Sequence, residues 1–287
     1  MRNDFWDWNN TLIGLKYANP NKVDFLTIQK GQLMKRSFRM IFGILAFSAC
    51  VSAMAITADE IVDKMQKAHD PEGKAKNVKT SLMKVNVTIP MQRIKMSVTQ
   101  KFREPDQQIT TTELPGVLKV IQVFDGKNGW EISSLAGKRL IKDKELDFLK
   151  FSTAISSIRN EFKDIFAKAE LGEDTVVEGV ECYQLIMTPK KEFNRDPMKC
   201  YVDKKTFLTR KTEMTLVGEQ GEMPGVTIME DYKSFDGILL PAKVTMEAAG
   251  LKMVQTVEKF DIDVKIEDSE FKMPGSLTAP APATEAK

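Results

Sequence analysis

The sequence has few of the residues from which catalytic and metal sites are usually built. Its 287 residues include one histidine, His69, and three cysteines. It contains no Cys-x-x-Cys, His-Glu-x-x-His or Gly-x-Ser-x-Gly motif and no glycine-rich phosphate loop. His69 stands at the end of a predicted helix, where a capping role is the simplest interpretation. We therefore predict that the protein is not an enzyme and that it holds no metal and no cofactor.

The charge balance gives no indication of nucleic-acid binding. The whole chain has 42 basic and 40 acidic residues, a formal net charge of +2. Residues 1–55, which we interpret below as lying outside the folded protein, hold seven of the basic and three of the acidic residues. The remaining chain has 35 basic and 37 acidic residues and no basic patch. A nucleic acid is therefore not an expected partner.

A pattern typical of an export signal begins at residue 34. Basic residues at 35, 36 and 39 precede an apolar segment at 40–49, and residues 53–55 (Ala-Met-Ala) match the small-x-small cleavage pattern. We predict a cleavable signal peptide at 34–55 and a periplasmic location for the exported protein. A signal peptide works only at the N-terminus, so residues 1–33 are interpreted as a misassigned start, with translation beginning at Met34, or as a disordered leader.

Two other interpretations of this segment stay open. The uncharged run at 40–58 is near the lower length limit for an uncleaved membrane anchor. Residues 47–50 (Phe-Ser-Ala-Cys) resemble a lipobox, in which case acylation of Cys50 would anchor the protein as a lipoprotein.

The other two cysteines, Cys182 and Cys200, are predicted to be free thiols. An exported pair suggests a disulfide. The two residues are, however, predicted on successive antiparallel strands joined by a loop near Phe193, which sets Cys200 opposite about Met187. Five residues of strand, at about 3.3 Å each, separate Met187 from Cys182, which is too far for a disulfide.

Periodicity predicts a mostly antiparallel β domain at 56–274. A capping box at 57–60 starts a helix that ends near His69, and apolar residues every three or four positions predict a second helical region at about 145–168. Asp-Gly turns at 125–126 and 236–237 are typical of hairpins. Residues 275–287 have the Ala/Pro-rich composition of a disordered tail. Beside the alternating stretches at 83–89, 94–102 and 118–124, we predict strands at 182–189, 198–204, 206–216, 225–234, 239–248 and 251–262.

Methionine is the residue that the folded part has in abundance. Twelve of the sixteen methionines follow residue 55, and most of these fall within predicted strands. Flexible, polarisable methionine suits surfaces that accept varied apolar ligands, although ordinary core filling gives the same composition. A strongly curved sheet with few helices cannot fill its own concave side, so we predict an apolar trough there.

The order of segments resembles the LolA-like superfamily of outer-membrane lipoprotein-sorting proteins. TADEIVDKM is followed by KFREPDQQITTTELPG, VFDGKNGWEIS, a helical segment, VDKKTFLTRK and DYKSFDGILLPAKVT. The resemblance implies an α+β fold that is mostly antiparallel β, a half-open curved β-barrel with helices forming a lid. It also implies a carrier or binding protein for lipid or lipoprotein acyl chains in the cell envelope. An envelope sensor or protein-interaction module, and a membrane-anchored lipoprotein acceptor, are the alternatives.

The resemblance gives expected partners and a candidate site. The partners would be acyl chains and an inner-membrane release complex or outer-membrane acceptor, with the protein itself a monomer. In the lipoprotein carrier a strand arginine holds the lid closed, and Arg93 and Arg103 are the candidates here. Trp130 follows a turn and could equally be plain core. The expected cavity lining is Met83, Val85, Val87, Ile94, Met96, Val98, Phe102, Leu118, Val120, Phe124 and Trp130, and the expected lid residues are Phe148, Phe151, Ile155, Ile158 and Phe162.

Overall fold

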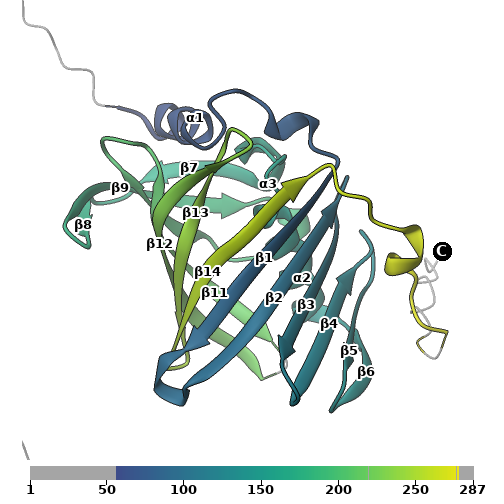
Figure 1. Ribbon diagram of the computed structural model, residues 1–287. Coiled ribbons are helices and arrows are strands. Elements are labelled where there is room, and N and C mark those ends of the chain that lie inside the picture. Colours follow the sequence, from purple (N-terminus) through teal and green to yellow (C-terminus); the bar gives the residue numbers. More distant parts are fainter. Residues whose placement is uncertain (1–55, 219, 276, 278–287) are drawn as a thin grey trace, which may run out of the picture. The chain divides into compact units, whose positions relative to one another are not determined.

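The computed structural model describes residues 56–218, 220–275 and 277, which form one curved antiparallel sheet with helices on one side (Figure 1). The predicted signal peptide, leader, Cys50 and most of the predicted tail lie outside the described residues. The helices are α1 (Ala58–His69), α2 (Asp143–Ser156) and α3 (Phe162–Ile165), with 3-10 turns η1 (Ala75–Asn77), η2 (Pro90–Gln92), η3 (Lys191–Phe193) and η4 (Asp268–Phe271). No described helix is long and apolar enough to cross a membrane.

The sheet has fourteen strands and is not closed. Its order is β6-β5-β4-β3-β2-β1-β14-β13-β12-β11-β10-β9-β7, with β8 paired to β9. The strands are β1 (Thr80–Ile89), β2 (Ile94–Arg103), β3 (Gln107–Leu114), β4 (Leu118–Phe124), β5 (Gly129–Ser133), β6 (Gly137–Ile141), β7 (Phe166–Leu171), β8 (Thr175–Val177), β9 (Val180–Pro189), β10 (Met198–Asp203), β11 (Thr209–Gly218), β12 (Gly221–Phe235), β13 (Ile238–Ala248) and β14 (Leu251–Ile262).

Local sequence signals place the first helix and two hairpins as predicted. The Thr57 side chain accepts a hydrogen bond from the Glu60 N–H, and the Glu60 carboxylate accepts one from the Thr57 N–H, so the capping box is complete. The turns at 125–126 and 236–237 join β4 to β5 and β12 to β13.

The second helical region differs from its prediction. The helix ends at Ser156, and a capping box between Glu161 and Asp164 starts the short α3. From Phe166 the chain is a strand, because it pairs with β9 at the edge of the sheet. Pairing with a distant strand thus overrides the helical period of residues 166–168.

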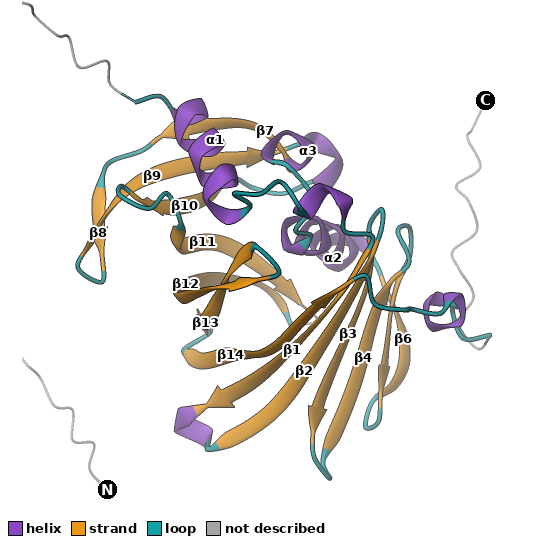
Figure 2. Ribbon diagram, turned by 45° about the horizontal axis from the view of Figure 1, so that its top comes forward, coloured by secondary structure: helices purple, strands orange, loops and turns teal. Residues whose placement is uncertain are grey.

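The two edges of the sheet, β6 and β7, are consecutive in the chain. The helices α2 and α3 connect them and lie on one side of the sheet, between the strands around β4 and those around β11 (Figure 2). The largest hydrophobic cluster lies under α1 and α2 and includes Ile61, Phe151 and Leu185. We define the inner face as the face of the sheet on which these helices pack.

The two cysteines in the described residues are free, as predicted, and both are buried. Cys200 lies opposite Leu185 rather than near Met187, two residues from the predicted register. Cys182 lies opposite Asp203 and packs with Tyr201, whereas Cys200 faces the cluster under the helices. The two thiols therefore point to opposite faces of the sheet.

Candidate functional site

Strand register extends the inner face across the whole sheet. Partners in antiparallel pairs point to the same side, and neighbours along a strand alternate. Ser81 and Met83 of β1 line a pocket beneath the α2–α3 connection and are therefore inward. One row of paired residues continues from Val87 through Met96 on β2, and in the other direction through Gln255 on β14 and Val244 on β13.

Every methionine in a strand lies on this inner face. Register gives Met246 of β13 opposite Met253 of β14 and Thr227 of β12. The same argument applied to each strand places all nine strand methionines inward and none outward within the described strands. They are Met83, Met96, Met187, Met198, Met214, Met223, Met229, Met246 and Met253.

The inner face has a covered part and a half-exposed part. Met187 and Met198 are buried under α1 and α2. Six others are half-buried and belong to none of the hydrophobic clusters of the described residues. Met83 is one of them and lines the pocket beneath the α2–α3 connection; the five outside that pocket are Met96, Met223, Met229, Met246 and Met253. An apolar surface that no element of the fold covers is a surface on which apolar ligands can be held.

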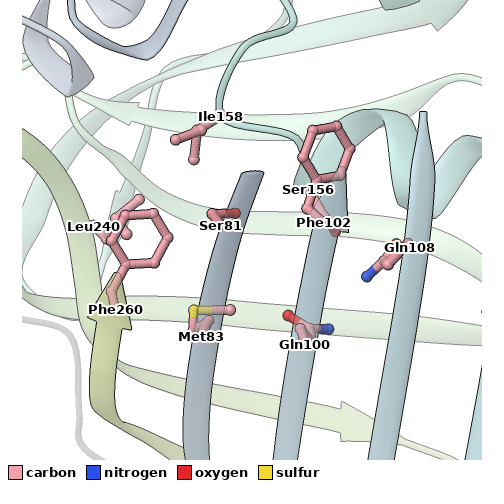
Figure 3. Close-up of a pocket in the computed structure, with 9 residues that line it drawn as sticks. All are labelled: Ser81, Met83, Gln100, Phe102, Gln108, Ser156, Ile158, Leu240 and Phe260. Carbon is pink, nitrogen blue, oxygen red and sulfur yellow. The ribbon is translucent and has the colours of Figure 1, made fainter. Parts of the chain in front are cut away.

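A small pocket of about 70 Å³ lies where the two parts meet (Figure 3). Its walls come from β1, β2, β3, β13 and β14, from the last residue of α2 and from the α2–α3 connection. The lining is mixed, with apolar side chains beside two glutamines: Ser81, Met83, Gln100, Phe102, Gln108, Ser156, Ile158, Leu240 and Phe260. The amides of Gln100 and Gln108 make the end of the apolar face nearest α2 polar.

Most of the predicted lining residues share the inner face. Register pairs Val85 with Val98 and Leu114 with Leu118, and Thr112 with Val120. Val85, Val87, Phe102 and Phe124 are buried, whereas Ile94, Met96, Val98, Leu118 and Val120 are half-exposed. The residues on this face are Met83, Val85, Val87, Ile94, Met96, Val98, Phe102, Leu118, Val120 and Phe124.

Two predicted lining residues take other roles. Phe124 is inward but lies fully covered, packed with Ile141 and Leu149 beneath α2. Trp130 points to the outer face, where it is 1% exposed and packs with Val123 and Phe271. Of the two interpretations of Trp130, plain core is the one that the structure has: the C-terminal segment covers β3–β6 from outside, so apolar residues of β4 and β5 are buried on both faces.

The predicted lid residues are divided between several contacts. Phe151 is buried in the cluster under α1, with Ile155 and Phe162 packed against that cluster. Ile158 is not helical; it lies in the α2–α3 connection and closes the pocket from above. The ring of Phe148 lies 5.3 Å from the guanidinium of Arg195.

Neither predicted gating arginine contacts the helices. Arg93 is exposed in the β1–β2 turn, with a left-handed φ of 55°. Arg103 is on the outer face, paired with Asp268 and 4.3 Å from the ring centre of Phe271. Both predictions fail because these residues lie far along the sheet or on its other side.

A different strand arginine binds α2, and the sequence analysis missed it. Arg139 of β6 donates two hydrogen bonds to Glu145 of α2, at 2.7 and 2.8 Å, and two longer ones to Glu131 of β5. The bonds to Glu145, and then those to Glu131, raise the pKa of the guanidinium above its ordinary value. The symmetric placement of Glu131 and Arg139 about the β5–β6 turn was the signal that could have revealed the pair.

The β9–β10 loop holds α2 from the other side. The Asn194 amide donates to Asp147 at 2.7 Å, and the Lys150 ammonium donates to the backbone carbonyl of Glu192 at 3.2 Å. Arg195 donates to the Thr215 carbonyl at 2.6 Å while its guanidinium lies over Phe148. The helix is therefore held by polar contacts to β6 on one side and to the β9–β10 loop on the other.

Comparison with known proteins places the fold. The chain matches a LolA superfamily protein of Nitrosomonas europaea at 14% identity and a TM-score of 0.51, covering 76% of this chain and 99% of that one. It matches a DUF1329 family protein of Desulfovibrio piger at 16% identity and a TM-score of 0.51, covering 76% and 98%. The fold is thus the LolA-like fold, as the order of motifs predicted.

Sequence comparison adds less. A model of a family described as an uncharacterized protein matches residues 148–274, from within α2 to just beyond η4. No curated protein matches the chain.

Proposed function

We propose that the protein is a carrier or binding protein of the cell envelope that holds acyl chains of a lipid or lipoprotein on its inner face. The observation that carries this proposal is the inward orientation of all nine strand methionines, five of them half-exposed and uncovered. Methionine adapts its shape to a ligand at little cost, which suits chains of varied length and branching. The LolA-like fold of the chain is consistent with this role.

The proposed acyl chain lies along the half-exposed strands and not inside the enclosed pocket. An apolar cavity of about 150 Å³ holds a ligand as small as benzene. The pocket beside α2 has about 70 Å³, too little for a long chain. Each CH₂ buried against the inner face contributes about 0.8 kcal/mol, so a chain of ordinary length binds usefully without entering the pocket. Displacement of α2 would add the covered residues to the site.

A charge on the inner face tests the proposal. Val98 of β2 is half-exposed and inward, whereas its neighbour Thr99 is half-exposed and outward. Val98→Glu places a carboxylate against the apolar chain, and we expect affinity for a fluorescent fatty acid to fall at least about a hundredfold. Thr99→Glu, the matched control, leaves the affinity unchanged. Circular dichroism reports whether each variant folds, and unchanged binding by a folded Val98→Glu protein removes this face from the proposal.

Mass spectrometry of the exported protein identifies the cargo and the location together. We propose that the protein is periplasmic after cleavage near Ala55, that it is monomeric, and that it exchanges cargo with an inner-membrane complex or an outer-membrane acceptor. Native spectra of the protein purified without detergent should then show the mass of a chain that begins at Ile56, together with a bound lipid or lipoprotein. A diacylated Cys50 species in the membrane fraction would instead make the protein an anchored acceptor.

A further inference from the structure

Four of the six large apolar side chains exposed on the described surface stand at the tips of four neighbouring hairpins. The exposed fractions are 82% for Met91, 60% for Val117, 72% for Leu135 and 38% for Leu251. Met91, Val117 and Leu135 lie in the β1–β2, β3–β4 and β5–β6 connections, and Leu251 is the first residue of β14, directly after the β13–β14 turn. We name these four residues the apolar rim.

The apolar rim lies at one end of the sheet. The four hairpins are consecutive in the strand order β6-β5, β4-β3, β2-β1 and β14-β13, and their tips all point the same way, downward in Figure 1. Adjacent strands are about 4.8 Å apart, so neighbouring tips are roughly 10 Å apart along the sheet. The four side chains therefore form a spaced row and not a continuous apolar patch.

The turns at the two ends of these strands differ in chemistry. The rim turns, at 90–93, 115–117, 134–136 and 249–250, contain no acidic residue. The turns at the other end are acidic: Asp106 follows β2, Asp125 follows β4 and Asp236 follows β12. Turns usually carry polar residues, so a methionine, a valine and a leucine in three successive turns, with Leu251 beside the fourth, need another explanation than turn geometry.

Each rim residue has a basic residue close in sequence. These are Arg93 beside Met91, Lys119 after Val117, Lys138 after Leu135 and Lys252 after Leu251. Glu113 pairs with Lys119 at 2.6 Å and Glu247 pairs with Lys252 at 3.2 Å. Arg93 and Lys138 have no ion pair with a described residue, so the rim has an excess of positive charge.

We propose that the apolar rim is a membrane-contact surface, by which the protein rests on an anionic lipid bilayer. Single apolar side chains with basic neighbours are the combination that inserts into a bilayer interface beside anionic headgroups. A protein partner would need four separate pockets at this spacing, whereas a bilayer accepts each tip independently. The apolar pairs Ile89–Ile94 and Leu114–Leu118 of the inner face end directly behind the rim. A lipid leaving the bilayer between the tips would thus meet the inner face first.

Vesicle flotation tests this surface with a matched control in the chain itself. Val117→Ser combined with Leu135→Ser should lower partitioning onto vesicles of phosphatidylcholine with phosphatidylglycerol about tenfold. Val176, which is 62% exposed on β8 and away from the rim, provides the control. Val176→Ser should leave partitioning within about twofold of the unchanged protein. Arg93→Gln with Lys138→Gln should lower binding several-fold on these vesicles but not on phosphatidylcholine alone.

The outcomes separate this proposal from the proposed function. Acyl-chain binding in solution, without vesicles, should be the same for the serine variants and the unchanged protein. If Val98→Glu abolishes acyl-chain binding but vesicle binding persists, membrane contact by the apolar rim does not depend on the acyl-chain site. Vesicle binding that is absent, that survives loss of Val117 and Leu135, or that falls equally in Val176→Ser overturns the membrane-contact surface.

Discussion

The two faces of the central strands have opposite chemistry. On β14 and β1–β6, all of which the structure describes, the inner face carries no lysine and one arginine, Arg139. The outer face of the same strands carries Lys84, Lys95, Lys101, Lys119, Lys138, Lys252, Lys259 and Arg103. The half-exposed part of the inner face thus combines apolar side chains with uncharged polar ones such as Thr112 and Gln255. This lysine-free inner face is consistent with the proposed binding of acyl chains.

Each face has one group of residues that departs from this distribution of charged and apolar side chains, and the two departures have different causes. On the outer face, Ile109, Val123 and Trp130 form an apolar patch, which the C-terminal segment covers with Phe271. On the inner face, the charge of Arg139 is paired twice and serves to hold α2. Changing either group tests whether the fold depends on it.

The largest effect on stability is expected from a change to the apolar patch of the outer face. Phe271 is buried against Trp130, and Phe271→Ala should lower the free energy of unfolding by about 3 kcal/mol through lost burial and a residual cavity. Urea unfolding measures the change. The exposed neighbour Lys272 provides the control, since Lys272→Ala should change it by less than about 0.5 kcal/mol. An unchanged midpoint for Phe271→Ala would mean that the segment is dispensable for the sheet.

A smaller effect on stability is expected from removing the charge of Arg139 on the inner face. Arg139→Gln leaves Glu131 and Glu145 close together without their shared partner, and the guanidinium is 29% exposed. We expect a loss of about 1–2 kcal/mol and faster amide hydrogen exchange in α2. Lys144 is a residue of α2 that pairs with Glu222 but is 72% exposed, and it provides the control. Exchange in α2 that is equally fast in Lys144→Gln would contradict a special role for Arg139.

The smallest effect concerns the covered part of the inner face. His69 lies against the Tyr232 ring, 3.2 Å from the Leu239 carbonyl, and burial lowers its pKa. The unfolded chain therefore binds a proton more readily, and stability should fall as pH drops below about 6.5, by up to about 1 kcal/mol. It is the only histidine in the chain. His69→Gln should flatten the unfolding free energy between pH 7 and 5, and an unchanged slope would exclude this group as its cause.

The sequence showed which residues of one strand share a face of the sheet, but it did not show which of the two faces is the inner one. The spacing of Met83, Val85 and Val87 placed them on one face, and the structure keeps them together. The same rule could not tell that the face of Trp130 is opposite, because the covering segment comes from residues more than a hundred positions later. Strands buried on both faces lose the polar half of the pattern on which the prediction depends.

The sequence also did not predict which charged residues, distant from one another in the chain, contact each other in the fold. The helix α2 was predicted from its period, yet the residues that hold it come from β6 and the β9–β10 loop. Arg93 and Arg103 were chosen by type and approximate place in the chain, and neither is near α2. Ion-pair partners depend on which strands become neighbours, and no local pattern contains that information.

The pairing of β1 with β14 also has a consequence for how the chain reaches this fold. Two meanders, β1–β6 and β9–β14, are each built from neighbouring hairpins, and only the β1–β14 ladder joins them. Its partners, such as Ser81 and Ile262, stand near opposite ends of the domain sequence. Contacts of such long range form slowly, because the loop between them must first be closed at an entropic cost. We therefore expect the β1–β14 pairing at the centre of the sheet to form last, and a chain that ends before β14 cannot form it.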